Sequence, residues 1–136
     1  MKDFTHPKFP TIHIKLLTTD AHLSQLNDLL NNSDAVSEFI PEGTSSDNKY
    51  LYGIFDDAKL VGVIDLIEDY PTKQAAYIHR FILEEDYVGN DLPSILYLSL
   101  EKTAQETGIK EMILDEELAK ENTWTDFGFV NNKKEI

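Results

Sequence analysis

The sequence predicts an α/β fold: a mixed central sheet, part antiparallel meander and part parallel β-α-β unit, with helices on both faces. Three β-rich runs follow one another between residues 49 and 83, separated by short polar turns, which is typical of an antiparallel meander. A strand at 75–83, a helix at 92–107 and a strand at 109–114 then form a crossover unit, whose strands should be parallel. At 136 residues the chain can bury one sizeable core.

The N-terminal part is expected to hold one strand and two helices. Residues 12–16 alternate apolar and polar side chains, as a strand does. Thr19 or Asp20 can cap a helix whose apolar face holds Leu23, Leu26, Leu29 and Leu30. Residues 33–40 indicate a second short helix, and residues 43–48 read as a loop.

The C-terminal part is expected to continue with alternating helices and strands. Apolar side chains repeat at helical spacing from Leu92 to Thr107, and Gly108 is a natural helix end. A last helix is predicted over 116–128, followed by a short terminal strand. Residues 1–10 are polar with two prolines and are interpreted as a flexible lead-in, which leaves 11–136 as a single domain.

Composition excludes several classes of function. The 25 acidic residues outnumber the 12 basic ones, and this net charge of −13 repels nucleic acid and anionic membranes. With no cysteine there are no disulfides or thiolate ligands, and the four histidines lack metal-ligand spacing, so no metal is expected. No apolar run has membrane-spanning length and no secretory signal is visible, which favours a cytoplasmic protein.

The element order and three local phrases resemble the GCN5-related N-acetyltransferase (GNAT) family over roughly residues 11–130. The family's second and third strands resemble "FDDAKLVGVIDLIEDYP", its fourth strand resembles "AAYIHRFILEEDY", and the end of its last core helix resembles "TWTDFGF". The resemblance implies an acyl-CoA N-acyltransferase fold and transfer of an acetyl group from acetyl-CoA to a small amine or a protein amino group. Acyltransferases of this shape often pair, so a homodimer stays open.

The resemblance also implies where the coenzyme would bind. In the family, a loop of pattern Arg/Gln-x-x-Gly-x-Gly/Ala binds the diphosphate through backbone amides at a helix start. That loop corresponds here to Val88, Gly89, Asn90, Asp91, Leu92, Pro93 and Ser94. The backbone that holds the thioester corresponds to Phe81, Ile82 and Leu83. Val88 replaces the Arg or Gln, Asp91 the first glycine, and Pro93 the second glycine or alanine.

These replacements weaken the predicted diphosphate site. Pro93 has no N–H, which removes a bond worth about 1.5–3 kcal/mol. A carboxylate of Asp91 at ~5 Å would repel the diphosphate by ~3 kcal/mol at an effective dielectric of about 20. A loss of ~3–6 kcal/mol turns a Kd of about 1 μM into roughly millimolar binding. Asp91 as N-cap and Pro93 in the first turn equally suit a plain helix start.

Two hypotheses therefore stay open: an acetyltransferase with a weak coenzyme loop, and a catalytically lapsed member that binds a partner. The candidate bases are Glu68, His79 and Glu84, of which only imidazole changes charge near neutral pH. Each can also be read as a solvated or structural side chain in so acidic a chain. Trp124 stands where many relatives carry a tyrosine acid, but indole cannot reprotonate a thiolate, so packing is its favoured role.

Overall fold

Seven strands form one mixed sheet in the computed structural model, which describes residues 4–6, 9–17, 20–30, 49–89, 91–120 and 123–136. The strands are β1 (Phe4–His6), β2 (Phe9–Leu16), β3 (Lys49–Asp56), β4 (Lys59–Glu68), β5 (Ala75–Leu83), β6 (Glu111–Leu114) and β7 (Lys133–Glu135). The helices are α1 (Asp20–Leu30), α3 (Leu92–Thr107), α4 (Glu116–Ala119) and α5 (Thr123–Asp126), with a 3-10 turn, η2 (Glu85–Tyr87).

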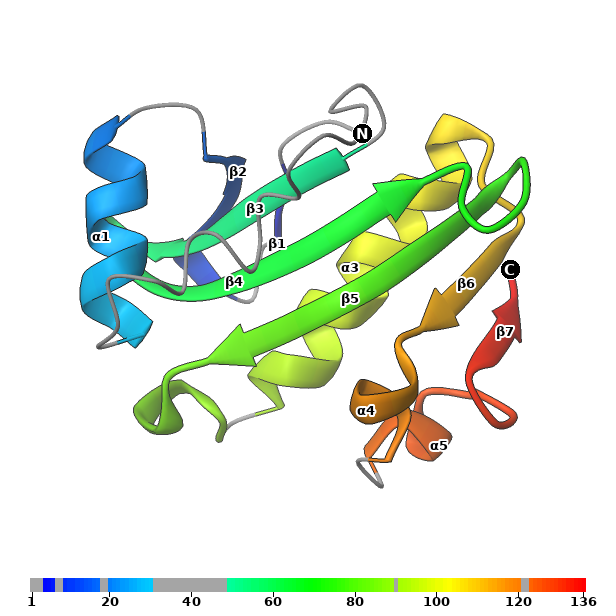
Figure 1. The fold of residues 1–136 in the computed structure, drawn as a ribbon. Helices are drawn as coiled ribbons and strands as arrows, with labels where there is room; N and C mark the ends of the chain where they lie inside the picture. Colours follow the sequence, from blue (N-terminus) through cyan, green and yellow to red (C-terminus); the bar gives the residue numbers. More distant parts are fainter. Residues whose placement is uncertain (1–3, 7–8, 18–19, 31–48, 90, 121–122) are drawn as a thin grey trace.

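The strands lie in chain order across the sheet, from β1 at one edge to β7 at the other (Figure 1). Neighbouring strands are antiparallel except β5 and β6, which are parallel and joined through α3. The predicted meander, crossover unit and short terminal strand are therefore confirmed.

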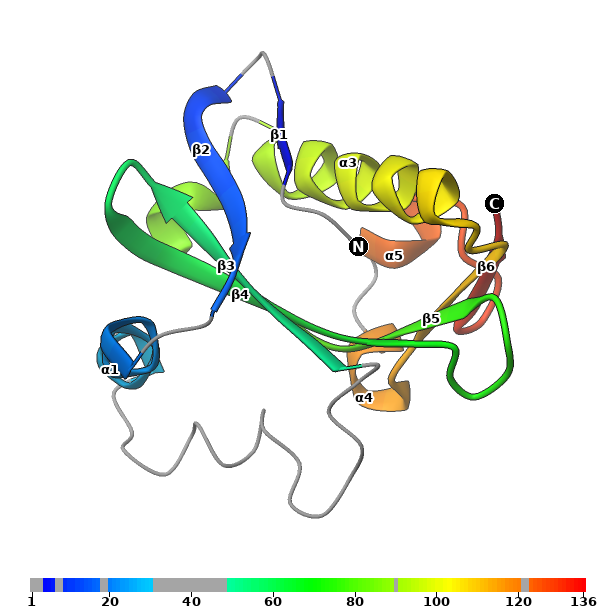
Figure 2. The same cartoon turned by 90° about the horizontal axis from the view of Figure 1, so that it is seen from above.

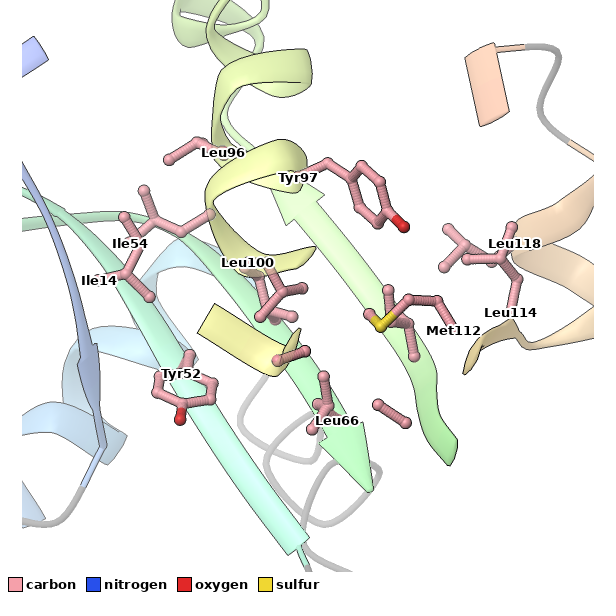
Figure 3. Close-up of a cluster of buried hydrophobic side chains, with 14 of the residues drawn as sticks. Ile14, Tyr52, Ile54, Leu66, Leu96, Tyr97, Leu100, Met112, Leu114 and Leu118 are labelled. Atoms are coloured by element: carbon pink, nitrogen blue, oxygen red, sulfur yellow. The ribbon is translucent and has the colours of Figure 1, made fainter. Parts of the chain in front are cut away.

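Helices cover both faces of the sheet, as predicted: Figure 2 shows α3 and α5 on one side and α1 and α4 on the other. The α3 helix runs over the bounds that its periodicity predicts and ends at Gly108, whose φ of +101° suits glycine. Its buried side chains point at the sheet and include Leu96, Tyr97 and Leu100, which Figure 3 shows against the strand residues.

The sheet separates two hydrophobic clusters. On the α3 side, strand residues such as Ile14, Ile54 and Leu66 pack with the helix. On the α1 side, a smaller cluster includes Leu26 of the helix and Val63 of β4. Because both faces are covered, β4 is buried almost throughout and its sequence is nearly all apolar.

Two expectations about the chain ends need correction. The described part of residues 1–10 contains β1 and the start of β2, which pair with each other, so it is not a loose lead-in. The predicted last helix over 116–128 is instead the two short helices α4 and α5. Leu118 and Trp124 are both buried, yet six residues along one helix would point their side chains about 120° apart.

The expected second helix over 33–40 and the loop over 43–48 lie outside the described residues.

Candidate functional site

The two parallel strands separate after a short paired stretch. Residues Ala75–Ile78 of β5 pair with Glu111–Leu114 of β6, and the last bond runs from the Asp115 N–H to the Ile78 carbonyl at 2.9 Å. Beyond Ile78, β5 continues to Leu83 while the chain after β6 turns into α4. The second half of β5 thus presents a backbone edge without a paired strand among the described residues (Figure 1).

The direction of the backbone groups along this edge follows from the pairing on the other side of β5. The Glu84 N–H donates to the Val61 carbonyl of β4 at 2.8 Å. Successive residues of an antiparallel strand direct their backbone groups to opposite sides. The N–H and carbonyl of Ile82, two residues before Glu84, therefore also point to β4. The N–H and carbonyl groups of Phe81 and Leu83 then point to the open edge. Of the three backbone positions predicted to hold a thioester, Ile82 therefore directs its groups to β4, whereas Phe81 and Leu83 direct theirs to the open edge.

An open groove of about 590 Å³ lies beside the loop that precedes α3. Its loop side is formed by Val88, Gly89, Asp91, Pro93 and Ser94, and its other walls by Leu98, Asp126 and Phe127. The structure thus brings five of the seven predicted loop residues to one groove. Leu92 is buried instead, and Asn90 lies outside the described residues.

The loop has few backbone amides to offer an anion. A helix start leaves four N–H groups without intrahelical partners, here those of Asp91, Leu92, Pro93 and Ser94. Proline has no N–H, and the Leu92 N–H donates to the Gly89 carbonyl at 3.2 Å. Among the described residues, the amides of Asp91 and Ser94 are the two at this helix start without a hydrogen-bond partner.

Asp91 occupies the N-cap position, but it does not cap the helix as predicted. Its φ is +63°, in the left-handed region, and its side chain accepts no capping hydrogen bond. This backbone conformation is the one that glycine adopts most easily and that aspartate tolerates. It therefore agrees with the family register that puts a glycine at this position.

The charges of the groove oppose an anionic ligand. Asp91 and Asp126 both line it, and none of its described lining residues is a lysine or arginine. Val88 and Leu98 are 52% and 50% exposed, so the remaining wall is largely apolar. Because Asp91 is exposed, solvent screens its repulsion and reduces the penalty expected from the sequence.

A side-chain hydrogen bond fixes the approach to the loop. The Tyr87 hydroxyl, at the end of η2, donates to Asp56 Oδ2 of the β3–β4 hairpin at 2.8 Å. This bond lowers the pKa of Asp56 and raises the pKa of Tyr87. The loop is thereby tied to the sheet just before the groove.

A histidine and an aspartate pair at the point where the strands separate. His79 is the first β5 residue beyond the paired stretch, and its Nδ1 lies 2.9 Å from Asp65 Oδ2 of β4. Asp65 is 0% exposed, whereas the His79 side chain is 33% exposed. Ile64 and Leu66 face α3, so the Asp65 side chain between them points to the opposite face, where α1 and α4 lie.

The other two predicted bases lie away from this point. Glu68 pairs in register with Ala76, about 10 Å along the strand from His79. Glu84 lies about 17 Å along β5 in the other direction and forms an ion pair with Lys59 at 3.4 Å. The structure therefore does not bring the three candidates together, and His79 is the one next to the open edge.

Trp124 belongs to the hydrophobic core. It is 4% exposed and lies edge-on to Phe81 and Tyr97, with ring centroids 5.7 and 5.4 Å away. Burial, followed by the Glu101 carboxylate, raises the pKa of Tyr97. This aromatic cluster, which also includes Phe127 and Phe129, packs behind the open edge of β5. The packing role expected for Trp124 agrees with this position.

Three polar residues of this region, Tyr77, Asp115 and Asp65, were missed in the sequence. The Tyr77 hydroxyl donates to Asp115 Oδ1 at 2.6 Å; burial and then this bond raise the pKa of Tyr77. Burial opposes ionisation of Asp115, but Tyr77, the Glu117 N–H and nearby positive charge together lower its pKa. Asp65 was missed as well, although it is the single charged residue in the apolar run 60–67.

The described part of the chain holds no grouping of metal ligands and no membrane-spanning helix. There, no three His, Asp or Glu side chains come together as ligands. No helix of that part of the chain is long and apolar enough to cross a membrane.

Comparison with known proteins relates the chain to acetyltransferases. Residues 18–129 match the acetyltransferase (GNAT) family. An acetyltransferase from Thermus thermophilus superposes with a TM-score of 0.69 at 16% identity, covering 93% of this chain and 97% of that one. An acetyltransferase from Streptococcus agalactiae gives 0.62 at 22% identity, covering 88% and 81%.

A third similar structure holds a coenzyme. The PaiA N-acetyltransferase from Thermoplasma acidophilum, solved in complex with coenzyme A, has a TM-score of 0.53 at 18% identity, covering 88% of this chain and 80% of that one. At such identities these structures support the fold alone. No curated protein sequence matches the chain.

Proposed function

Since the chain belongs to the acetyltransferase (GNAT) family, we propose that it transfers an acetyl group from acetyl-CoA to an amine while holding the coenzyme weakly. The acceptor is a small amine or a protein amino group, and the excess of acidic residues suits a cationic one. Acetyl-CoA, when bound, supplies the acetyl group as a thioester.

The observation that carries this proposal is the open backbone edge of β5. Phe81 and Leu83 direct their N–H and carbonyl groups to the side where β6 has turned away. Such an edge can hold an extended amide-bearing arm, as a further strand would be held. A preorganised N–H of this kind can also polarise a thioester carbonyl. These groups fit the acyl and pantetheine end of the coenzyme.

The loop fits the other end of the coenzyme poorly. Two usable amides, two carboxylates and no described cation face the place where a diphosphate would lie. The proposal therefore includes weak coenzyme binding, with a Kd of roughly 0.1 to several millimolar.

Titration with acetyl-CoA, by calorimetry and by thermal shift at moderate salt, tests this proposal. We expect saturation in the millimolar range, and release of coenzyme A thiol that depends on an added primary amine such as butylamine. Tight micromolar binding would mean that the loop has been misjudged. No response at several millimolar ligand, with no thiol release, would contradict acetyl transfer.

A second candidate function is a lapsed enzyme that binds a partner in the same groove. The observation in its favour is the lining itself, in which Asp91 and Asp126 flank the half-exposed Val88 and Leu98. That surface suits an apolar ligand with positive charge better than a diphosphate. Amine-dependent thiol release from the wild-type protein would count against this candidate.

A further inference from the structure

The candidate site has parts on both faces of the sheet. The groove lies on the side of α3 and α5, since it is lined by residues of both helices. The contact between His79 and Asp65 lies on the other face, the side of α1 and α4, at the point where β5 and β6 separate. An acceptor amine that does not share the groove can approach this point from the α1 and α4 side. His79 lies there beside Asp115, at the start of α4.

The position of His79 depends on an irregularity in strand pairing. Asp65 pairs with Arg80, and the next β4 residue, Leu66, pairs with Ile78, so His79 is an extra residue in β5. A bulge of this kind redirects a side chain and is common next to functional sites. Here it brings the His79 ring within hydrogen-bond distance of the buried Asp65 carboxylate.

Resting on the proposed function, we propose that Asp65 is a positioning residue that holds His79 as the base for the acceptor amine. A carboxylate can only accept, so the neutral ring carries its proton on Nδ1 and keeps a lone pair on Nε2. Among the described residues, Nε2 has no hydrogen-bond partner. With the side chain one-third exposed, this nitrogen is available to an acceptor.

Two carboxylates lie close to His79. Asp65 faces it from β4, and Asp115, at the start of α4, is close enough for the charge of His79 to act on it. Tyr77 and Arg80 of β5 also lie near Asp115. The negative charge of the two carboxylates attracts a cationic acceptor to this face.

The proton transfer is simple to balance. One N–H bond of the acceptor's ammonium breaks, its electron pair stays on nitrogen as the nucleophilic lone pair, and the proton bonds to His79 Nε2. The resulting imidazolium returns the proton to water through the exposed side of the ring. Asp65 takes no part in the proton transfer and keeps its hydrogen bond to Nδ1, as an orienting carboxylate does in other histidine pairs.

The first test needs no substrate. Nitrogen-15 correlation spectra of the histidine rings in the intact protein report which ring nitrogen carries the proton. We expect the Nδ1–H form for neutral His79 in the wild type. In Asp65→Asn the amide can donate to Nδ1, so the proton should move to Nε2. An Nε2–H ring in the wild type, or no change in the variant, would overturn the proposal.

The second test measures thiol release from acetyl-CoA with butylamine. His79→Ala should lower the rate about 10²–10⁴-fold, and added imidazole should restore part of it. Asp65→Asn should lower the rate without loss of fold, whereas Asp57→Asn, in the exposed β3–β4 turn, should not. Asparagine suits the positive φ of residue 57, which makes this a matched control.

The outcomes separate this inference from the proposed function. Thiol release that survives His79→Ala, or a loss that imidazole does not rescue, would overturn the role of His79 while acetyl transfer stands. If the wild type releases no thiol although its ring is in the Nδ1–H form, the proposed function fails. The pair would then serve only to join β4 and β5.

Discussion

The open edge of β5 and the loop before α3 are a few residues apart, yet they differ in how well they suit the same coenzyme. The edge presents its groups through the backbone of Phe81 and Leu83, whatever their side chains are. The loop depends on particular residues, and on the proposed register Asp91 and Pro93 take positions where glycine or alanine would offer amides. Features held by packing thus persist with the fold, whereas features that depend on exposed side chains can change independently.

The surroundings of the two regions explain this difference. Behind the edge, the Phe81 ring packs against Trp124, so any change there disturbs the core. At the loop, Asp91 is exposed and Val88 is half-exposed, and a Cβ added at Gly89 would meet no atom within 4 Å. Substitutions in such a place cost little stability. A family fold therefore does not by itself guarantee the family's binding chemistry.

The largest effect should come from Trp124→Ala, which attacks the packed region. Removing a buried tryptophan should lower the free energy of unfolding by about 3–5 kcal/mol, because its ring contacts with Phe81 and Tyr97 are lost. Urea unfolding followed by circular dichroism measures this. Leu98→Ala, at a half-exposed groove position, is the control and should change stability by no more than about 0.5 kcal/mol. Equal effects of the two variants would remove the distinction between the regions.

A smaller effect is expected from repairing the loop with Asp91→Gly and Pro93→Gly together. The double variant regains an amide at residue 93 and loses a carboxylate, and glycine suits the left-handed φ of residue 91. One charge-assisted hydrogen bond is worth about 1.5–3 kcal/mol, so acetyl-CoA should bind roughly ten to a hundred times more tightly by calorimetry. Asp91→Asn separates the loss of charge from the gain of the amide. Unchanged affinity in the double variant would show that the register of the loop is wrong.

Much of the fold could be predicted because hydrophobic periodicity carries it. The meander and the α3 crossover follow from alternating and helical patterns that the core then buries. The break between α4 and α5 was missed because each helix has only four residues, too short for a period to be read. The left-handed φ of Asp91 was missed because aspartate is equally typical of an ordinary N-cap.

The candidate site was predicted less well, for a reason that concerns register. Residue types alone could put His79 on a strand and mark the loop as a candidate coenzyme site. They could not pair His79 with Asp65, because that contact depends on an extra residue in β5 at the point where it passes Asp65. Cross-strand neighbours are set by register and bulges, and neither can be read from one strand's own pattern.

The smallest effect is expected from a change in the ligand. Replacing acetyl-CoA by acetyl-pantetheine compares the β5 edge and the loop most directly, because it removes the diphosphate and leaves the protein unchanged. Acetyl-pantetheine keeps the arm that would lie along Phe81 and Leu83 and lacks the nucleotide that the loop would bind. If the edge supplies most of the affinity, acetyl-pantetheine should bind the wild type within about threefold of acetyl-CoA, a difference of roughly 0.6 kcal/mol. In the double variant with the repaired loop, the difference in affinity between the two ligands should increase in favour of acetyl-CoA. A wild-type preference for acetyl-CoA of about a hundredfold or more would mean that the loop still binds the diphosphate with the two amides left to it, and that the contrast between edge and loop does not hold.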